Sequence, residues 1–278
     1  MKLTKDLPCC GAPEDVIEKL IQEKVECGCG GFSVPDQSKV ENPQKPKTEI
    51  TDLLLETLKE KSEKLGIVSV GYTKIPESVL DDNELKYSNA IVFTYPIGMD
   101  IVNEPPSELT QRLNDVLYAL FGNITYELSD FLREEGFQTQ TIHPMDGKVG
   151  FSQLGEEAKL GFIGKSGLLI SPELGPRLKI SAILTSIENL PYTDENSHKW
   201  IRSYCERCSK CTKKCPQKAL IEQQNKLAKA HLVDEKCIGC SQGCTYCIEA
   251  CPFFTNGYEW VLEKQMKLEA KLKEKGKL

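Results

Sequence analysis

Nine of the chain's 13 cysteines lie in two stretches near its C-terminus, four in the first and five in the second. The first stretch, CERCSKCTKKCP, has the spacing CxxCxxCxxxCP, and the second, CIGCSQGCTYCIEACP, also ends in CxxxCP. Thiolates at this spacing ligate [4Fe-4S] clusters, because three of them bind one cube and the cysteine before the proline binds a neighbouring cube. The pattern therefore predicts one-electron transfer at a pair of iron-sulfur clusters.

Each predicted cluster takes ligands from both stretches. Cluster 1 is assigned Cys205, Cys208, Cys211 and Cys251. Cluster 2 is assigned Cys215, Cys237, Cys244 and Cys247. Cys240 remains the alternative to Cys237; we favour Cys237 because the helix-like segment 218–231 brings the chain back just before it.

Structural zinc sites are the alternative interpretation, since CxxC pairs also bind zinc in a tetrahedron. Zinc requires neither the proline nor two copies of the CxxxCP ending. Cations flank the first stretch, and they would raise the potential of an anionic cluster and attract an acidic electron donor, although an ordinary solvated face explains them equally well. These cations are Arg202, Arg207, Lys210, Lys213 and Lys214.

Four further cysteines lie near the N-terminus, on either side of an amphipathic helix expected over 12–25. They are Cys9, Cys10, Cys27 and Cys29. A zinc site, a third cluster, a redox-active vicinal pair and ordinary free thiols all remain open for them.

The chain of 278 residues is too long to be a simple electron-carrying ferredoxin. We therefore expect a larger domain that holds the group to which the clusters deliver electrons. Residues 1–47 are read as a cysteine-containing extension and linker, 48–200 as a mixed α/β layer domain, 201–256 as a ferredoxin-like module and 257–278 as a charged helix. Apolar spacing predicts helices over 48–66 and 107–136, with Ser107 as a cap and Gly122 as a break. Strands are expected over 67–73, 90–96, 137–144, 167–171 and 179–187.

Composition narrows the function classes. The net charge of -6 gives nucleic acid no electrostatic reason to bind. The longest apolar runs are far shorter than the ~20 residues of a membrane span. No export signal is visible at the N-terminus, and 13 cysteines in a reducing compartment favour metal binding over disulfides, so we expect a cytoplasmic protein.

Segment 143–191 contains six glycines between 147 and 167, which permit close approach of the backbone to a flat ligand. It contains neither GxGxxG after a strand nor a GxxxxGK[ST] loop, so the sequence indicates no dinucleotide or nucleoside triphosphate site. Two clusters beside such a domain indicate delivery of electrons to a cofactor or substrate held within it.

The segments GFIGKSGLLI and GPRLK, followed by the two cysteine stretches, resemble the shared core of epoxyqueuosine reductases and reductive dehalogenases over roughly residues 85 to 255. The resemblance implies an α+β protein: a nitroreductase-like α/β domain carrying a ferredoxin-like module with two [4Fe-4S] clusters. It also implies a cobalamin held between them, although a flavin, which other nitroreductase-like folds use, remains open.

The same resemblance implies the site residues. Lys165 matches a basic residue over the cobalt face that assists protonation or binds the leaving group, Asp146 lies near a catalytic acid, and Tyr126 or Tyr118 offers a phenolic proton donor. The cofactor-binding positions are Gly161, Gly164, Lys165, Gly167, Gly175 and Arg177. Surface or hydrogen-bonding roles are expected of His143, His198 and His231.

The expected function is a cytosolic oxidoreductase that reduces a small molecule or modified base with electrons from a ferredoxin or flavodoxin. The chain departs from the family in ending in a charged helix, where epoxyqueuosine reductases continue into helical repeats, and in lacking the twin-arginine leader of respiratory dehalogenases. The alternative is a non-catalytic electron-transfer protein, or a reductive activator of a corrinoid-protein partner.

Overall fold

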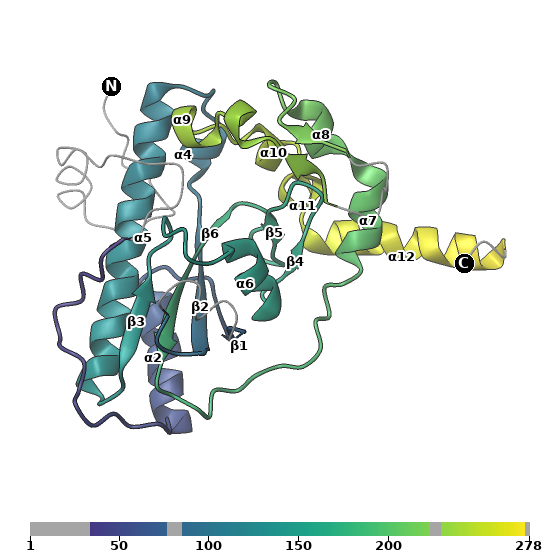
Figure 1. Cartoon of the computed structure of the whole chain (residues 1–278). Helices are drawn as coiled ribbons and strands as arrows, with labels where there is room; N and C mark the ends of the chain where they lie inside the picture. Colours follow the sequence, from purple (N-terminus) through teal and green to yellow (C-terminus); the bar gives the residue numbers. More distant parts are fainter. Residues whose placement is uncertain (1–33, 77–84, 223–228, 276–278) are drawn as a thin grey trace.

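The structure is a computed structural model that describes residues 34–76, 85–222 and 229–275, except for the side chain of Cys240. The strands are β1 (Ser69–Lys74), β2 (Asn89–Pro96), β3 (Thr139–Ile142), β4 (Phe162–Ile163), β5 (Leu169–Ile170), β6 (Leu178–Thr185), β7 (Leu220–Ile221) and β8 (His231–Leu232). The helices before the cysteines are α2 (Asp52–Lys64), α4 (Met99–Val102), α5 (Glu108–Glu134) and α6 (Phe151–Glu157). From the cysteines onward they are α7 (Ile201–Cys208), α8 (Lys210–Lys214), the 3-10 turn η1 (Asp234–Lys236), α9 (Gly239–Gln242), α10 (Tyr246–Glu249), α11 (Pro252–Thr255) and α12 (Tyr258–Glu274). Figure 1 shows their arrangement.

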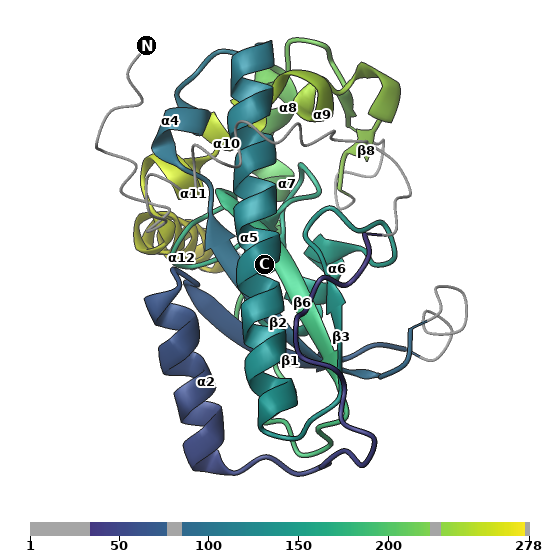
Figure 2. The ribbon, with the colours of Figure 1, turned by 90° about the vertical axis from the view of Figure 1, so that its left-hand side faces the viewer.

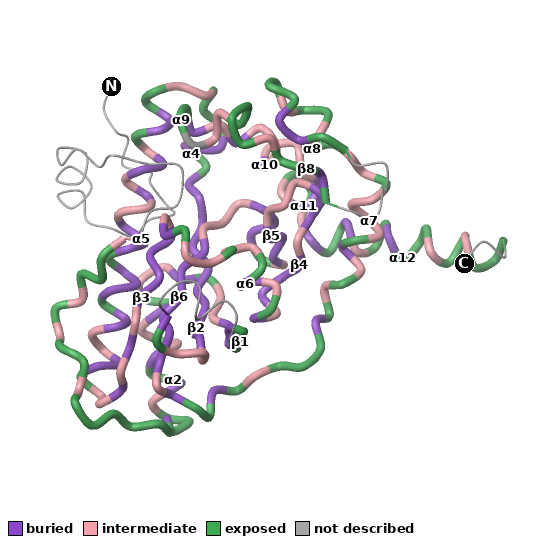
Figure 3. Tube along the Cα trace, viewed as in Figure 1, coloured by how far each residue is buried: buried purple, intermediate pink, exposed green. Residues whose placement is uncertain are grey.

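A four-stranded antiparallel sheet in the order β1-β2-β6-β3 forms the centre of the larger domain. Both faces are covered, as the side chains of β2 show: Ile91 and Phe93 point into one apolar cluster and Val92 into the other. Helices α2 and α5 lie over the first face (Figure 2), and α6 packs on the second. Figure 3 shows that the buried residues follow the central strands and the inner side of α5.

The sequence located the two long helices α2 and α5 and all four strands of the central sheet. Ser107 caps α5 as expected, since its hydroxyl accepts a hydrogen bond from the backbone N–H of Thr110 at 3.1 Å. Gly66, at φ +88°, ends the segment that contains α2. The prediction that Gly122 breaks the long helix was wrong: α5 is continuous, and the missing side chain instead makes room for His143, whose Nε2 would collide with a Cβ at this position.

The segment 218–231 was predicted to be helix-like, and its described ends contradict this. Leu220–Ile221 and His231–Leu232 pair as the antiparallel strands β7 and β8. Leu220 pairs across to Leu232 in this short two-stranded sheet. The pairing of β7 with β8 still brings the chain back just before Cys237, as the cluster assignment requires.

Residues 34–47, predicted to be a linker, have no regular secondary structure but are fixed along the α/β domain. We call them the strap. Asn42 exchanges two hydrogen bonds with the backbone of Thr139 on the edge strand β3, at 2.9 and 2.7 Å. The backbone N–H of Lys47 donates to Gly136 O at 2.9 Å. The strap therefore belongs to the α/β domain, occupying the open edge of β3.

The cysteine-rich module packs against the α/β domain at two places. The loop before Cys244 lies over the first turn of α5, where the backbone N–H of Gly243 donates to Gln111 Oε1 at 2.8 Å. A separate apolar cluster joins Phe162 on β4 and Ile201 on α7 to Val261 on α12. Beyond this contact α12 extends away from the body (Figure 1), and no helix among the described residues has the length and apolar character needed to cross a membrane.

Candidate functional site

The four thiols assigned to cluster 1 line one small cavity. Its wall also includes Lys165, Tyr204 and Phe253. The cysteine ligands in the wall are Cys205, Cys208, Cys211 and Cys251. They come from α7, α8 and the residue before α11, so the fold brings together cysteines from both stretches, and the residues present suit a four-thiolate cluster.

The thiols assigned to cluster 2 also influence one another. Burial raises the pKa of Cys244, and the charges of Cys237 and Cys215 raise it further. Burial likewise raises the pKa of Cys247 to about 12, with added contributions from Cys211, Cys244 and Cys237. Because Cys211 belongs to the cluster 1 set, the two sets are close neighbours. Cys240, the alternative ligand, lies outside the described side chains.

Burial and neighbouring thiolates also raise the pKa values of thiols assigned to cluster 1. Burial raises the pKa of Cys205 and of Cys251 to about 12, and repulsion from neighbouring thiolates acts in the same direction. Such thiols ionise only when a cationic metal core compensates their charge. The eight described cysteines are all free of disulfides, which leaves their sulfur atoms available as ligands.

Lys165 is buried beside cluster 1, with 6% of its surface exposed. Its Nζ donates to the carbonyl oxygen of Glu206 at 3.0 Å and to Ser209 Oγ at 2.9 Å, both between cluster 1 cysteines. Glu222 Oε1 lies 3.9 Å from the same nitrogen. The lysine thus links the β4–β5 turn to the cluster loop.

A larger cavity of about 540 Å³ opens next to cluster 1. Lys165 and Cys205 line both this cavity and the small cavity of cluster 1, so the two spaces share a wall. We call the larger space the cluster-side cavity. Its other charged walls are Glu156, Glu157, Arg202, Glu206 and Lys229. Its volume falls in the range typical of small-molecule sites.

Two of the predicted cofactor-binding glycines line the cluster-side cavity. Gly164 lines the cavity but packs closely against its neighbours, because a Cβ there would stand 2.6 Å from Ile170 Cδ1 and 3.5 Å from Cys205 Sγ. Gly167, at φ +84°, would present a Cβ to open space. Gly161 instead packs tightly under the hairpin, where a Cβ would collide with the backbone oxygen of Ile170.

Gly175 and Arg177 lie elsewhere. A Cβ on Gly175 would stand 2.9 Å from the backbone of Phe253, so this glycine allows the β5–β6 loop to approach α11. The guanidinium of Arg177 donates to the backbone oxygen of Ile97. Neither residue lines the cluster-side cavity. A cofactor-binding role for them stays a prediction, and the contacts present are structural.

Asp146 and Tyr126 are anchored to neighbouring residues, Val34 and Pro35. Both are buried, and both contact the strap: Asp146 Oδ2 accepts from the N–H of Val34 at 3.3 Å, and the hydroxyl of Tyr126 donates to Pro35 O at 3.1 Å. The ring of Tyr126 stacks on His143 at 6.0 Å. Neither residue is among those that line the cluster-side cavity.

The remaining singled-out side chains have ordinary partners. Tyr118 lies under the ammonium of Lys179, 3.7 Å from the ring centroid. His198 Nδ1 lies 2.7 Å from the hydroxyl of Tyr258, and His231 is exposed on β8. The N-terminal thiols Cys9, Cys10, Cys27 and Cys29 lie outside the described residues.

The sequence analysis did not predict that residues of α6 line the cluster-side cavity. Gly150, Phe151 and Gln153 line it, and Glu156 also fixes the β4 hairpin by accepting from the N–H of Ile163 at 2.7 Å. Seven residues of helix are too short to show a clear apolar period. The only available signal was that this stretch lies between the glycines of segment 143–191.

Among comparisons with known proteins, a match to a protein family covers the cysteine-rich module. The 4Fe-4S dicluster domain family matches residues 199–252. This range holds both CxxxCP endings and excludes the charged C-terminal helix. The module is therefore a 4Fe-4S dicluster domain.

Curated relatives extend the comparison to the α/β domain. The tetrachloroethene reductive dehalogenase of Sulfurospirillum multivorans is 25% identical over 210 residues, which cover 68% of this chain and 41% of that protein. That of Desulfitobacterium hafniense is 26% identical over 161 residues, covering 58% and 28%. The epoxyqueuosine reductase of Synechococcus sp. (strain RCC307) is 34% identical over 109 residues, covering 35% and 32%. The chain thus spans less than half the length of these relatives.

Solved structures share the fold. A catabolic reductive dehalogenase superposes with a TM-score of 0.62 at 16% identity, over 87% of this chain and 36% of that one. An epoxyqueuosine reductase bound to an epoxyqueuosine-modified tRNA stem loop superposes at 0.52 and 16% identity, over 74% and 66%.

The relatives of this chain, in sequence and in fold, are reductive dehalogenases and epoxyqueuosine reductases, and these homologues are reductase enzymes. A mixed α/β domain with a C-terminal dicluster domain is confirmed. The negative net charge is weak evidence against nucleic acid, because one structural relative binds a tRNA stem loop.

Proposed function

We propose that the chain is an iron-sulfur oxidoreductase that passes low-potential electrons through two [4Fe-4S] clusters to a corrinoid in the cluster-side cavity. One observation carries the proposal: Lys165 and Cys205 belong to the walls of both the cluster 1 cavity and the cluster-side cavity. An electron on cluster 1 is therefore separated from a ligand in the larger cavity by one layer of side chains. A bound corrinoid would supply a cobalt ion able to reduce an organic substrate.

The chain's own residues support a site of this kind. Gly164 and Gly167 both line the cavity, and a Cβ on Gly167 would meet nothing within 4 Å, so the wall is open to a ligand at this glycine. Arg202 and Lys229 line the cavity together with Glu157 and Glu206, while Glu156 accepts a hydrogen bond from the β4 backbone. Lys165 is the proposed source of a proton at the reacting atom, held in place by its contacts with the cluster loop.

Other parts of the proposal are supported by the relatives alone. One superposing structure, at a TM-score of 0.61, is a reductive dehalogenase for which a mechanism of B12-dependent dehalogenation is suggested, and this favours cobalamin over a flavin. The α/β domain is proposed to be nitroreductase-like and the protein cytoplasmic. The substrate class is a small molecule or a modified base, as in the two groups of relatives.

A second function, electron transfer without catalysis or reductive activation of a corrinoid protein, is favoured by one observation. Asp146 and Tyr126, the expected acids, contact the strap and do not line the cluster-side cavity. In this alternative the cavity serves docking, and the clusters remain the functional centre.

An anaerobic absorption titration separates the two functions. Protein with its clusters in place is mixed with cob(II)alamin, and the corrinoid band is followed. The oxidoreductase proposal expects a shifted band that saturates at one corrinoid per chain. An unshifted band, together with rapid cluster reduction by a carrier protein, would favour electron transfer alone.

A further inference from the structure

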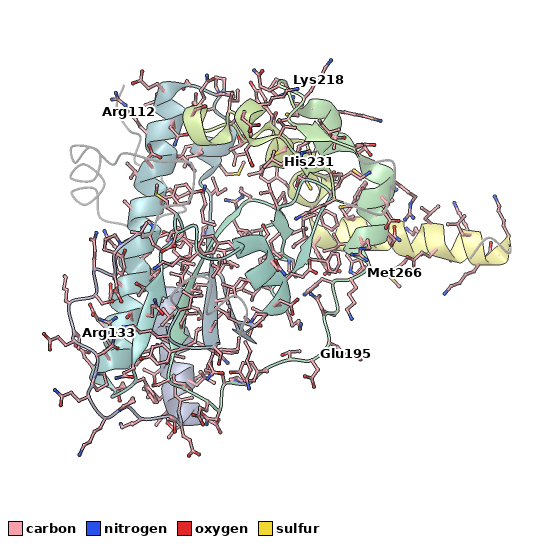
Figure 4. The ribbon with its side chains drawn as sticks, viewed as in Figure 1. Arg112, Arg133, Glu195, Lys218, His231 and Met266 are labelled. Carbon is pink, nitrogen blue, oxygen red and sulfur yellow. The ribbon has the colours of Figure 1, made fainter. Side chains whose placement is uncertain are left out.

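Three exposed lysines lie on the short helix α8. They are neither cluster ligands nor lining residues of the cluster-side cavity. Lys210, Lys213 and Lys214 are exposed, and with Glu249 they line a concave surface of about 530 Å³. We call these three residues the lysine patch. The labelled side chain of Lys218 points outward from the same end of the molecule (Figure 4).

The patch is positive in a chain that is negative. Residues 199–218 contain seven lysines and arginines and one acidic residue, Glu206, whereas the whole chain has a net charge of -6. Lys214 pairs with Glu249 at 3.7 Å, but among the described residues neither Lys210 nor Lys213 has an ion pair within 4.0 Å. A concentrated positive surface on an acidic protein attracts an acidic partner and speeds its encounter.

The patch borders both clusters. Cys211 of cluster 1 lies between Lys210 and Lys213, and Cys215 of cluster 2 follows Lys214 directly. The cluster-side cavity touches the cysteine loop at its other end, through Cys205. Electrons entering at the patch would therefore reach the clusters first and the cavity last.

We propose that the lysine patch is the docking surface for an acidic one-electron carrier protein of the flavodoxin or ferredoxin class. One electron leaves the reduced carrier and enters one oxidised cluster, and no bond forms or breaks. The inference rests on the clusters of the proposed function but not on the corrinoid. An RNA partner fits less well, because Tyr246, the ring beside the patch, is covered by the ammonium of Lys214 at 5.3 Å, and RNA recognition depends on open stacking surfaces.

Stopped-flow reduction of the full chain by a reduced low-potential flavodoxin tests the proposal. The variant K210E/K213E/K214E is compared with K271E/K273E/K275E, which makes the same charge change on exposed residues at the end of α12 and just after it. At low ionic strength the patch variant should be reduced at least about ten-fold more slowly than wild type, and the control much less affected. Wild-type rates should also fall as salt is added.

Reduction by dithionite, which needs no docking, should be equal in all three proteins and shows that the clusters are intact. If the triple variant does not retain its clusters, the variant K210Q/K213Q, with a smaller charge change, is compared with wild type instead. Equal slowing of patch and control variants, or a wild-type rate independent of salt, would overturn the proposal. So would a patch variant that loses binding of a tRNA stem loop while its reduction rate is unchanged. A chain that binds no cobalamin yet shows the expected rates would leave this inference standing and remove the corrinoid.

Discussion

Lys165 joins the two spaces on which the proposed electron path depends. Its ammonium is buried and bonded to the loop between Cys205 and Cys211, and Glu222 is its nearest carboxylate partner at 3.9 Å. A positive charge at this place favours the reduced, more negative form of cluster 1. The residue is thus expected to tune the cluster whatever it does for a substrate.

Substitution Lys165→Met should lower the midpoint potential of cluster 1 on the order of 60 mV, a factor of ten in the one-electron equilibrium. Methionine keeps the apolar stem and removes only the charge. A redox titration followed by paramagnetic resonance measures the change, with Lys218→Met on the exposed edge as the control. An unchanged potential would show that the ammonium does not act on the cluster.

His143 predicts a pH dependence of stability. Burial lowers its pKa to about 4, and its Nδ1 accepts a hydrogen bond from the N–H of Met145 at 3.2 Å, so the folded chain holds it neutral. Unfolded histidine titrates near 6.5, so between these values the unfolded chain binds the extra proton. Stability should therefore be complete above pH 6.5 and fall by about 2 kcal/mol on reaching pH 5.

Urea unfolding at pH 7.5 and pH 5 measures this loss, with His143→Gln as the comparison. The variant should lack that part of the pH dependence, because glutamine does not titrate. Parallel losses in both proteins would assign the acid sensitivity to other groups, the clusters included.

Single residues also show how far sequence reasoning reaches. The cysteines were assigned from spacing, because cluster ligands must lie on a tight loop, and the assigned set of cluster 1 lines one cavity. Roles for Asp146 and Arg177 came from resemblance and stay predictions; neither residue lines the cluster-side cavity, and no local pattern encodes their hydrogen bonds to Val34 and Ile97. Contacts between side chains from different helices and strands depend on tertiary packing. The spacing of residues along the sequence does not predict them.

The strap likewise depends on tertiary contacts that its own sequence does not predict. Its prolines and lack of periodicity correctly indicated irregular backbone, but the hydrogen bonds that fix it come from residues about 90 positions later. Arg133 on α5 is the main contact. Its guanidinium donates to Asp36 at 2.5 Å, to Val40 O at 2.7 Å and to Thr139 Oγ1 at 2.7 Å.

Replacing Arg133 by methionine should destabilise the protein by about 3 kcal/mol, because the side chain is only 7% exposed and its loss leaves these acceptors unpaired. Arg112→Met is the matched control, since Arg112 lies on the same helix with its side chain 70% exposed (Figure 4) and should cost less than about 0.5 kcal/mol. Urea denaturation compares the two. Similar costs would mean that the strap is not held by Arg133.

Across the whole molecule, three contacts hold the cysteine module and α12 to the α/β domain. The loop before Cys244 lies on the first turn of α5, the loop of Cys205 is tied to the β4–β5 turn through Lys165, and α12 is anchored by Val261. The cysteine module thus contacts the larger domain on both sides of the space where the proposed cofactor would receive electrons. The proposed function as an electron relay depends on the clusters being present.

Metal and sulfide analysis of anaerobically purified protein tests that dependence most directly. Two bound [4Fe-4S] clusters predict about eight irons and eight sulfides per chain, and a paramagnetic signal from reduced clusters after dithionite. Two zinc ions per chain with no sulfide and no signal on reduction would contradict the presence of the clusters, and with it both the proposed reductase and the docking of an electron carrier.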